Sequence, residues 1–207
     1  MIRLHEYHAY RLSGLWHVHT NYTDGANTPE EIVDFAVENH FPLVGFVEHV
    51  REDLTYDFEE FRARAFAAAA DRPIECVVGC EAKVLDVDGT LDVSADVLEH
   101  ADVVYAAYHG TPFSQAEYVE SVLATLENPA VDVWAHPFTY PTAAGFTIPE
   151  SDVDRILETL VETNVHFERN LSRPPTALSR PLRSVSVPTI VGYDLHDLDT
   201  WSPVASQ

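Results

Sequence analysis

The sequence predicts a parallel α/β fold. Seven short apolar segments alternate with segments of helical pattern along the 207 residues, which is the arrangement of a parallel sheet with crossover helices. The run ADVVYAAY (101–108) is apolar throughout, as expected of a strand buried on both faces. At or just past the C-terminal end of six of the seven segments stands a histidine, aspartate or glutamate. In α/β barrels that face carries the chemistry, so the same observation predicts where a functional site would lie.

The first half of the chain is predicted to contain three strands and two helices. The opening strand ends within GLWHVHTNYTDG (14–25). Thr28 is a typical helix N-cap, followed by a proline and an acidic first turn, so a helix is predicted from Pro29 to about His40. The remaining elements are a strand over LVGFVEHV (43–50), an alanine-rich helix over 57–70 and a strand over IECVVGCEAKV (74–84).

The second half repeats this alternation. The apolar run over 101–108 is followed by a helix over 114–127 and by the strand VDVWAHPF (131–138), which Pro137 prevents from continuing. The segment 174–186 contains arginines and is only weakly helical. The other predicted elements are a helix over 149–162 and strands over 165–168 and 188–193.

Two histidines stand one residue apart at the end of the first strand. Alternation along a strand predicts that His17 and His19 point to one side, where they can hold one metal ion, and that Trp16 and Val18 point to the other. Asp24 adds a carboxylate five residues later. Chance is a sufficient explanation for one such histidine pair, so this segment alone does not establish a metal site.

The remaining strand ends carry further residues of metal-binding types, and their joint occurrence argues against chance. Together with the first strand, the candidates are His17, His19, Asp24, His49, Glu81, His109, His136, Asp194 and His196. The other five histidines lie in the N-terminal segment, at helix ends or within a strand, and we interpret them as surface or packing residues: His5, His8, His40, His100 and His166.

Composition predicts one domain, over residues 1–207, because a chain of this length with 46% hydrophobic residues supports one sizeable core. The segment from Arg3 to Arg11 is charged where a signal peptide would be apolar, and no apolar stretch of about 18 residues occurs. We therefore expect a soluble, cytoplasmic protein without a membrane partner. Cys76 and Cys80 lie in an apolar segment, which favours small buried side chains over a disulfide, with a two-cysteine metal site as the alternative.

The formal net charge of −22 is extreme, and Lys83 is the only lysine among twelve basic residues. A carboxylate-rich, lysine-poor surface suits molar salt, where the Debye length falls to about 3 Å, so we infer a halophilic origin. The alternative, an acidic face for a basic partner, predicts clustered acids, whereas here they are spread from Glu6 to Asp199. No basic patch interleaved with aromatic residues is present, so nucleic-acid binding is disfavoured.

The motifs resemble those of the PHP superfamily, the polymerase and histidinol phosphatase domain. The resemblance runs from about Leu15 to Asp197 and is carried by HVH, the pair Glu48-His49, GCEAKV, AYHG, AHPF and the final DLH. The run from Glu81 to Gly110 looks most like the small stand-alone phosphoesterases and less like the polymerase-associated domains. The resemblance implies a distorted (β/α)7 TIM-like barrel with a trinuclear metal site at the C-terminal ends of the strands.

The resemblance also implies how the ligands divide among three divalent ions, which would be zinc, manganese or iron. The first ion would be held by His17, His19, Glu81 and Asp194. Glu81 would bridge to a second ion, held by His109 and His136, while the third would take Asp24, His49 and His196. Glu81, His109 and Asp194 are the residues expected to act in catalysis.

Two features depart from the family pattern. Tyr193 precedes Asp194 where the family usually has a small residue, so the pocket shape is in question. The chain also ends soon after the last strand, so completion of the barrel by a partner chain in an oligomer is a further hypothesis.

Three divalent ions facing three ligand carboxylates would make a cationic pocket, which suits a phosphate ester, and paired metals generate hydroxide near neutral pH. We therefore expect hydrolysis of a small phosphomonoester, such as histidinol phosphate or a nucleotide. Arg51, Arg169 and Arg173 are expected to bind phosphate, or else to be counter-charges on an acidic surface. The pair Glu168-x-Asn170 is expected to shape its loop. The alternatives are a phosphodiesterase or nuclease and a non-catalytic, metal-stabilised interaction module.

Overall fold

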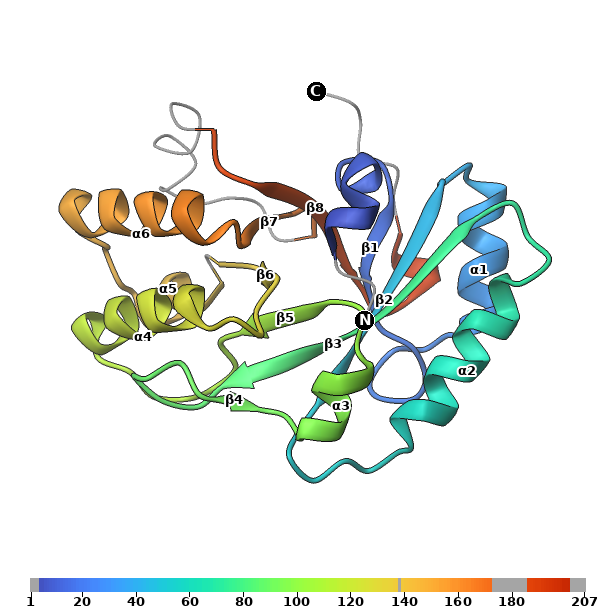
Figure 1. Ribbon diagram of the computed structural model, residues 1–207, viewed down its shortest axis with the longest axis horizontal. Helices are drawn as coiled ribbons and strands as arrows, with labels where there is room; N and C mark the ends of the chain where they lie inside the picture. The colour runs from blue at the N-terminus through green and yellow to red at the C-terminus, as the bar shows by residue number, and fades with distance from the viewer. Residues whose placement is uncertain (1–3, 138, 173–185, 202–207) are drawn as a thin grey trace.

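Seven parallel strands form a closed barrel in the computed structural model, which describes residues 4–137, 139–172 and 186–201 (Figure 1). Around the barrel each strand pairs with its two neighbours. Because β1 pairs with both β2 and β8, the barrel closes within one chain. The predicted (β/α)7 barrel is therefore confirmed, and no partner strand is needed for closure. The barrel strands are β1 (Leu15–Val18), β2 (Leu43–Val50), β3 (Glu75–Val84), β5 (Val104–Ala107), β6 (Val133–Trp134), β7 (His166–Asn170) and β8 (Thr189–Leu195).

The four longer helices lie outside the barrel (Figure 1). They are α1 (Pro29–Glu38), α2 (Phe58–Ala69), α4 (Gln115–Glu127) and α6 (Glu150–Thr163). The predicted start of α1 is confirmed, because the Thr28 hydroxyl accepts from the Glu31 amide while the Glu31 carboxylate accepts from the Thr28 amide. None of the described helices is both long enough and apolar enough to cross a lipid bilayer.

Several short elements escaped prediction. Each is only one or two turns or a two-residue strand, which is too short for a hydrophobic period to be visible in the sequence. They are the 3₁₀ helices η1 (Leu4–Tyr10) and η4 (Leu198–Thr200), the antiparallel strand β4 (Leu91–Asp92) beside β3, and the helices α3 (Ala95–His100) and α5 (Thr139–Ala144). The weak helix predicted over 174–186 lies, apart from Ser186, outside the described residues.

Apolar side chains form an interior cluster and two outer clusters. The interior cluster includes Trp16, Val47 and Tyr105 and contains only residues of the strands and their immediate ends. The outer clusters lie between the strands and the helices, one under α1 and α2 and the other under α4 and α6. The segment η1 covers the N-terminal end of the barrel, where Tyr10 packs against the interior cluster and its carbonyl accepts a 3.0 Å hydrogen bond from the Trp16 indole.

The first strand does not follow the predicted alternation. Trp16 belongs to the interior cluster whereas Val18 belongs to the outer cluster under α1, so the prediction that both point to one side is wrong. The cause is an irregularity at His17, which has a φ of 61°, and the pairing of β1 with β2 and β8 shifts register between Trp16 and Val18. Because the irregularity turns two successive side chains inward, His17 and His19 still reach the same end of the barrel.

The structure places both features that depart from the family pattern, namely Tyr193 and the short segment after the last strand. Tyr193 packs with the outer cluster, its ring 5.7 Å from that of Phe41, so it does not fill the barrel end. Trp201 lies beyond the last strand with its ring 5.1 Å from Phe35 of α1. Cys76 and Cys80 are free thiols in the same outer cluster, and burial raises the pKa of Cys76 to about 12, so both are packing residues as predicted.

Candidate metal centre

All nine candidate side chains converge at the C-terminal ends of the strands. They form four overlapping groups in which the possible ligand atoms lie within 4.8 Å of one another. The groups are His19, Asp24, His49 and His196; His17, Glu81 and His136; His17, His19 and Asp194; and His49, Glu81 and His109. Strand ends that are far apart in the sequence therefore bring together the residues that their positions predicted.

Glu81, at 1% exposure, occupies the middle of the buried part of the site. Its Oε1 lies 2.8 Å from His136 Nε2 and 3.5 Å from His109 Nε2. The same oxygen is 3.4 Å from His17 Nε2. Asp194 Oδ1 completes this region, at 3.7 Å from the Nε2 atoms of both His17 and His19. Each of the four buried or half-buried imidazoles thus faces a carboxylate oxygen.

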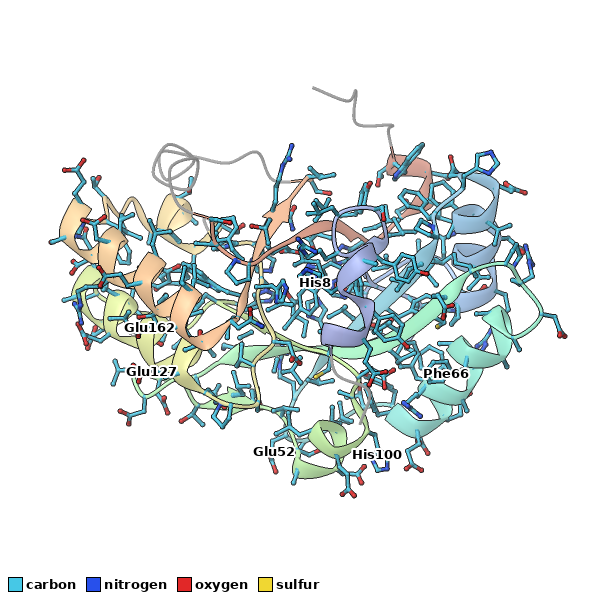
Figure 2. All side chains as sticks on the ribbon, turned by 45° about the horizontal axis from the view of Figure 1, so that its top comes forward. His8, Glu52, Phe66, His100, Glu127 and Glu162 are labelled. Carbon is cyan, nitrogen blue, oxygen red and sulfur yellow. The ribbon has the colours of Figure 1, made fainter. Side chains whose placement is uncertain are left out.

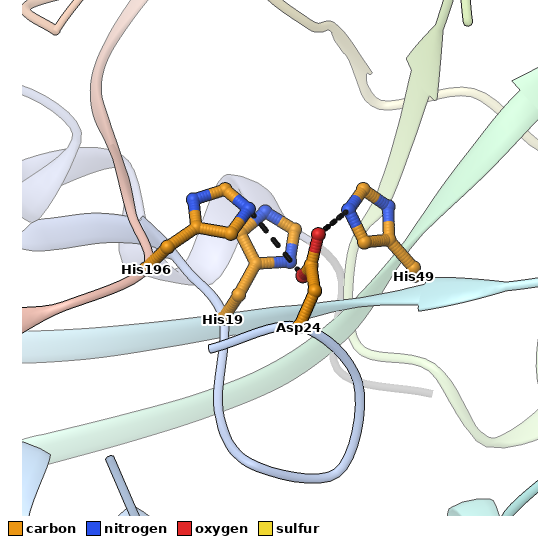
Figure 3. Close-up of side chains that lie close together, drawn as sticks. All are labelled: His19, Asp24, His49 and His196. Atoms are coloured by element: carbon orange, nitrogen blue, oxygen red, sulfur yellow. Dashed lines mark ion pairs between the residues drawn. The ribbon is translucent and has the colours of Figure 1, made fainter. Parts of the chain in front are cut away.

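Asp24 belongs to a more open part of the site (Figure 3). Its Oδ2 lies 3.3 Å from His49 Nε2, and its Oδ1 lies 3.4 Å from His196 Nε2. His19 stands behind this group, with its ring stacked on those of His49 and His196 at 4.4 and 4.2 Å. The side chain of Asp24 is 56% exposed. The group expected to contain three ligands thus has His19 as a fourth possible donor, and it opens to solvent.

Three of the candidate ligands have a left-handed backbone, which is rare outside glycine. His17, His136 and Asp194 have φ values of 61°, 26° and 48°. The two other non-glycine residues with positive φ in the described part of the chain, His40 and Asn164, follow helices. Such a conformation costs about 1–3 kcal/mol and is concentrated at functional sites. Ligand placement is therefore achieved against the local backbone preference.

Glu168 orients two of the candidate ligands, a role that the sequence did not reveal. Its Oε1 lies 2.5 Å from Nδ1 of His17, and its Oε2 accepts a 2.5 Å hydrogen bond from the His136 amide. A carboxylate on Nδ1 fixes the ring so that Nε2 faces the centre, as in carboxylate–histidine–metal arrangements. Gly192 leaves room for this contact, because a Cβ there would lie 1.8 Å from Glu168 Oε1.

Glu48 holds the loop that carries Asp24. Its Oε1 accepts a 2.6 Å hydrogen bond from the Thr20 amide, and its Oε2 accepts from the Thr23 hydroxyl. Gly25 lets the loop fold closely over the strand, since a Cβ there would lie 2.4 Å from the His19 carbonyl oxygen. Burial raises the pKa of Glu48. The pair Glu48-His49 therefore combines a loop anchor with a candidate ligand.

The charges of the buried residues are coupled. Burial by itself would raise the pKa of Glu81, but His17 and the hydrogen bonds of His109 and His136 bring it well below its usual range. Burial also opposes protonation of His17, yet Glu168 and Glu81 raise the pKa of that imidazole. The pKa of His19 is well below its usual value because of burial and the neighbouring His17, so His19 is neutral, the form that binds metal.

The donor set fits a divalent transition metal. Buried atoms without a hydrogen bond in the described structure include His17 Nε2 and both ring nitrogens of His19. Such groups are costly unless an ion or water satisfies them. His109 Nε2 and His136 Nε2 lie 3.2 Å apart, close to the roughly 3.3 Å separation of two nitrogens that bind one tetrahedral zinc. Mixed imidazole and carboxylate donors suit zinc, manganese or iron without selecting among them.

The predicted phosphate-binding arginines are less well placed. Arg51 donates to the Val50 carbonyl, and its Nε lies 3.6 Å from a carboxylate oxygen of Asp92. Arg169 is exposed on β7 between the buried Glu168 and Asn170, so alternation directs it away from the barrel interior. This placement does not favour a phosphate contact for Arg169. Arg173 lies outside the described residues.

The fold and the site define a parallel α/β barrel protein with a candidate metal-binding centre at the C-terminal ends of its strands. The chain belongs to the PHP domain family, whose family model matches residues 16–168. It is 29% identical over 171 residues to the DNA polymerase/3'-5' exonuclease PolX of Bacillus subtilis, an alignment that covers 77% of this chain and 29% of PolX.

Two further relatives carry the name probable phosphatase. That of Caldanaerobacter subterraneus subsp. tengcongensis is 28% identical, with 59% of this chain and 51% of that protein aligned. That of Clostridium novyi is 30% identical, with 57% and 51% aligned. The chain thus spans about half, or less, of the length of these curated relatives. The two phosphatases and PolX have similar sequence identities to this chain. The prediction that the chain resembles the stand-alone phosphoesterases more than the polymerase-associated domains therefore stays a prediction.

A solved structure shares the fold. It is a two-domain protein from Bacteroides vulgatus containing a predicted PHP-like metal-dependent phosphoesterase. The match has a TM-score of 0.55 and 16% identity, and it covers 90% of this chain and 52% of that chain.

Proposed function

We propose that this protein is a metal-dependent phosphoesterase that hydrolyses a small phosphomonoester. The observation that carries the proposal is the convergence of nine candidate ligands around the buried Glu81, with buried imidazole nitrogens of His17 and His19 left without hydrogen bonds. The relatives named probable phosphatase support it. A non-catalytic interaction module is disfavoured, because such a role would not require the complete ligand set.

The residues of the site have different proposed roles: binding ions, orienting a ligand and lining the entrance. Divalent ions bound here would activate water and neutralise charge on a phosphoryl group. In the proposed ligand assignment Glu81 and Asp194 would hold the first ion, Glu81 would also contribute to the second, and Asp24 would hold the third. Glu168 holds His17 with Nε2 toward the centre. His109 and His196 are each 32% exposed, so they line the open side through which a substrate must enter.

Phosphodiester hydrolysis is the second candidate function. It is supported by the likeness to PolX, whose alignment covers more of this chain than do those of the two phosphatases. The two functions differ in the charge of the substrate, since a monoester is a dianion near neutral pH and a diester is a monoanion. Three ions beside three ligand carboxylates favour the dianion.

The first prediction concerns turnover. Metal-loaded protein in 3 M KCl should hydrolyse p-nitrophenyl phosphate faster than bis(p-nitrophenyl) phosphate. Glu81→Gln should lower kcat by about 100-fold or more, because it removes the shared carboxylate of the centre. Arg155→Gln, on the exposed face of α6, is the control and should keep full activity. Faster cleavage of the bis-ester would favour the second candidate, and no turnover of either ester by fully loaded protein would reject both.

A further inference from the structure

Lys83, the only lysine of the chain, lies beside the candidate metal centre. On β3 the side chains of Cys80 and Ala82 belong to the outer cluster, whereas Glu81 between them points into the site. The pairing of β3 runs without a register shift, as far as Ala82 with β2 and as far as Lys83 with β5. Alternation therefore places Lys83 on the same face as Glu81, about 7 Å further toward the open end of the barrel.

The neighbours of Lys83 leave room on that face. Its partner on β5 is Ala107, a small residue of the interior cluster, and the candidate ligand His109 follows two residues later. Lys83 is itself partly buried. A flexible four-carbon stem at this position is long enough for the ammonium group to reach a ligand bound at the centre.

The ammonium group of Lys83 has no carboxylate at ion-pair distance among the described residues. The nearest candidate in the strand pairing, Asp92 on β4, is already engaged by the Glu52 amide at 2.8 Å and by Arg51 at 3.6 Å. In contrast, Arg64, Arg72 and Arg155 each form an ion pair on the surface. Although the chain has 34 acidic residues, its one lysine thus forms no ion pair within the described part of the structure and lies on the strand face that carries Glu81.

We propose that Lys83 binds the phosphoryl group of the substrate and favours dianionic monoesters over monoanionic diesters. The inference rests on the proposed phosphoesterase function. A compact ammonium charge suits the non-bridging oxygens that face away from the bound ions. Removing that charge should weaken binding of the dianion more than binding of the monoanion, because the Coulomb attraction scales with the ligand charge.

The test uses the full chain loaded with Mn²⁺ and inorganic phosphate as the probe, with binding measured by calorimetry and metal content by elemental analysis. Lys83→Gln should bind phosphate about 10-fold more weakly or worse, with an unchanged metal content. Lys83→Arg should recover most of the affinity. Arg155→Gln, which removes one positive charge from the exposed face of α6, should bind phosphate like the wild type.

Kinetics provide the second readout. Lys83→Gln should raise KM for p-nitrophenyl phosphate more than KM for the bis-ester. Unchanged phosphate affinity, or loss of bound metal from Lys83→Gln, would overturn the inference. Because phosphate binding is measured without turnover, a Lys83-dependent affinity in a protein that cleaves neither ester would reject the proposed function and leave the role of Lys83 standing.

Discussion

At the scale of single residues, Glu168 shows how the chain fixes its candidate ligands. One carboxylate contacts both the His17 ring and the His136 amide, and Gly192 is the residue that makes space for it. Both of the ligands that it holds have a left-handed backbone. Losing the carboxylate should therefore release two ligands from strained positions at once.

Glu168→Gln should lower metal affinity by about 10- to 100-fold while the protein stays folded, because the amide can accept one of the two hydrogen bonds but carries no charge. Titration of metal into apo-protein measures this. Glu162→Gln, on an exposed position of α6, is the matched control and should bind metal like the wild type. Equal affinities for Glu168→Gln and the wild type would show that the carboxylate does not support the ligands.

His166, a packing histidine as its place within a strand predicted, should make folding sensitive to acid. Burial, with His8 and Arg11 nearby, lowers its pKa to about 4. Between about pH 6.5 and pH 4 the unfolded chain therefore binds a proton that the folded protein does not, so stability falls as the pH falls. The loss should approach about 3 kcal/mol.

Urea unfolding of the wild type and of His166→Gln at pH 7 and pH 4.5, both in EDTA to remove metal, would measure this contribution. The variant should be less stable at pH 7, through lost packing, and should lose less stability on acidification. Parallel losses in the two proteins would mean that folding does not lower the pKa of His166.

Most of the candidate ligands could be predicted because they stand at or near the end of an apolar run, and closed parallel strands bring such positions together. The backbone and side-chain geometry that orients these ligands toward the centre could not be predicted. His17 and Asp194 need backbone conformations that the identity of the residue does not encode, and the orienting role of Glu168 depends on strands that are distant in the sequence. The prediction that Trp16 points away from the barrel interior failed for a similar reason. One irregular residue, His17, reverses the alternation along β1 on which that prediction depended.

At the scale of elements, the loop between β1 and α1 carries the most accessible part of the centre. Asp24 is 56% exposed there, whereas Glu81 on β3 is 1% exposed and has the ring nitrogens of five histidines within 3.9 Å of its carboxylate oxygens. An ion held by the loop should therefore leave first. Its retention depends on the Glu48 hydrogen bonds that hold the loop in place.

Asp24→Ala should lose about one metal per chain, while Glu81→Ala should lose two or more, since Glu81 is shared in the proposed assignment. Graded chelation of the wild type should release one equivalent before the others. Elemental analysis of the wild type and both variants provides the counts. A full metal complement in Asp24→Ala, or equal losses in the two variants, would contradict the division of ligands among the ions.

Strands and long helices were predictable from local pattern, whereas the short elements were not. A buried parallel strand such as β5 is a continuous apolar run, and the N-cap Thr28 followed by Pro29 indicates where α1 begins. By contrast, β4 consists of two residues whose pairing with Lys83 and Val84 is defined only by the folded sheet. Its position matters, because Asp92 and Arg51 meet there at the edge of the site.

At the scale of the whole molecule, the net charge of −22 remains to be explained by the environment. The acids are distributed over the outer surface, and Figure 2 shows Glu127 and Glu162 near each other on the α4–α6 side. A cleft between these helices is lined by Asp88, Glu120, Glu127, Glu158 and Glu162 around the single cation Arg155. At 0.1 M salt, where the Debye length is about 10 Å, neighbouring carboxylates in this cleft repel one another.

A halophilic origin, as proposed from the composition, predicts that thermal stability rises with salt through screening. The melting temperature of the wild type should be higher in 3 M KCl than in 0.1 M KCl.

Salt also strengthens apolar burial, so a charge-reduced variant separates the two effects. Glu158→Gln combined with Glu162→Gln, both exposed in the cleft, should raise the melting temperature in 0.1 M KCl and leave it nearly unchanged in 3 M KCl, where the Debye length is below about 3 Å. Calorimetric scans of both proteins at both salt concentrations measure the four midpoints. Equal midpoints of the wild type at the two concentrations would count against adaptation to salt, and equal gains for the variant at both would show that these carboxylates act through local packing and not through repulsion.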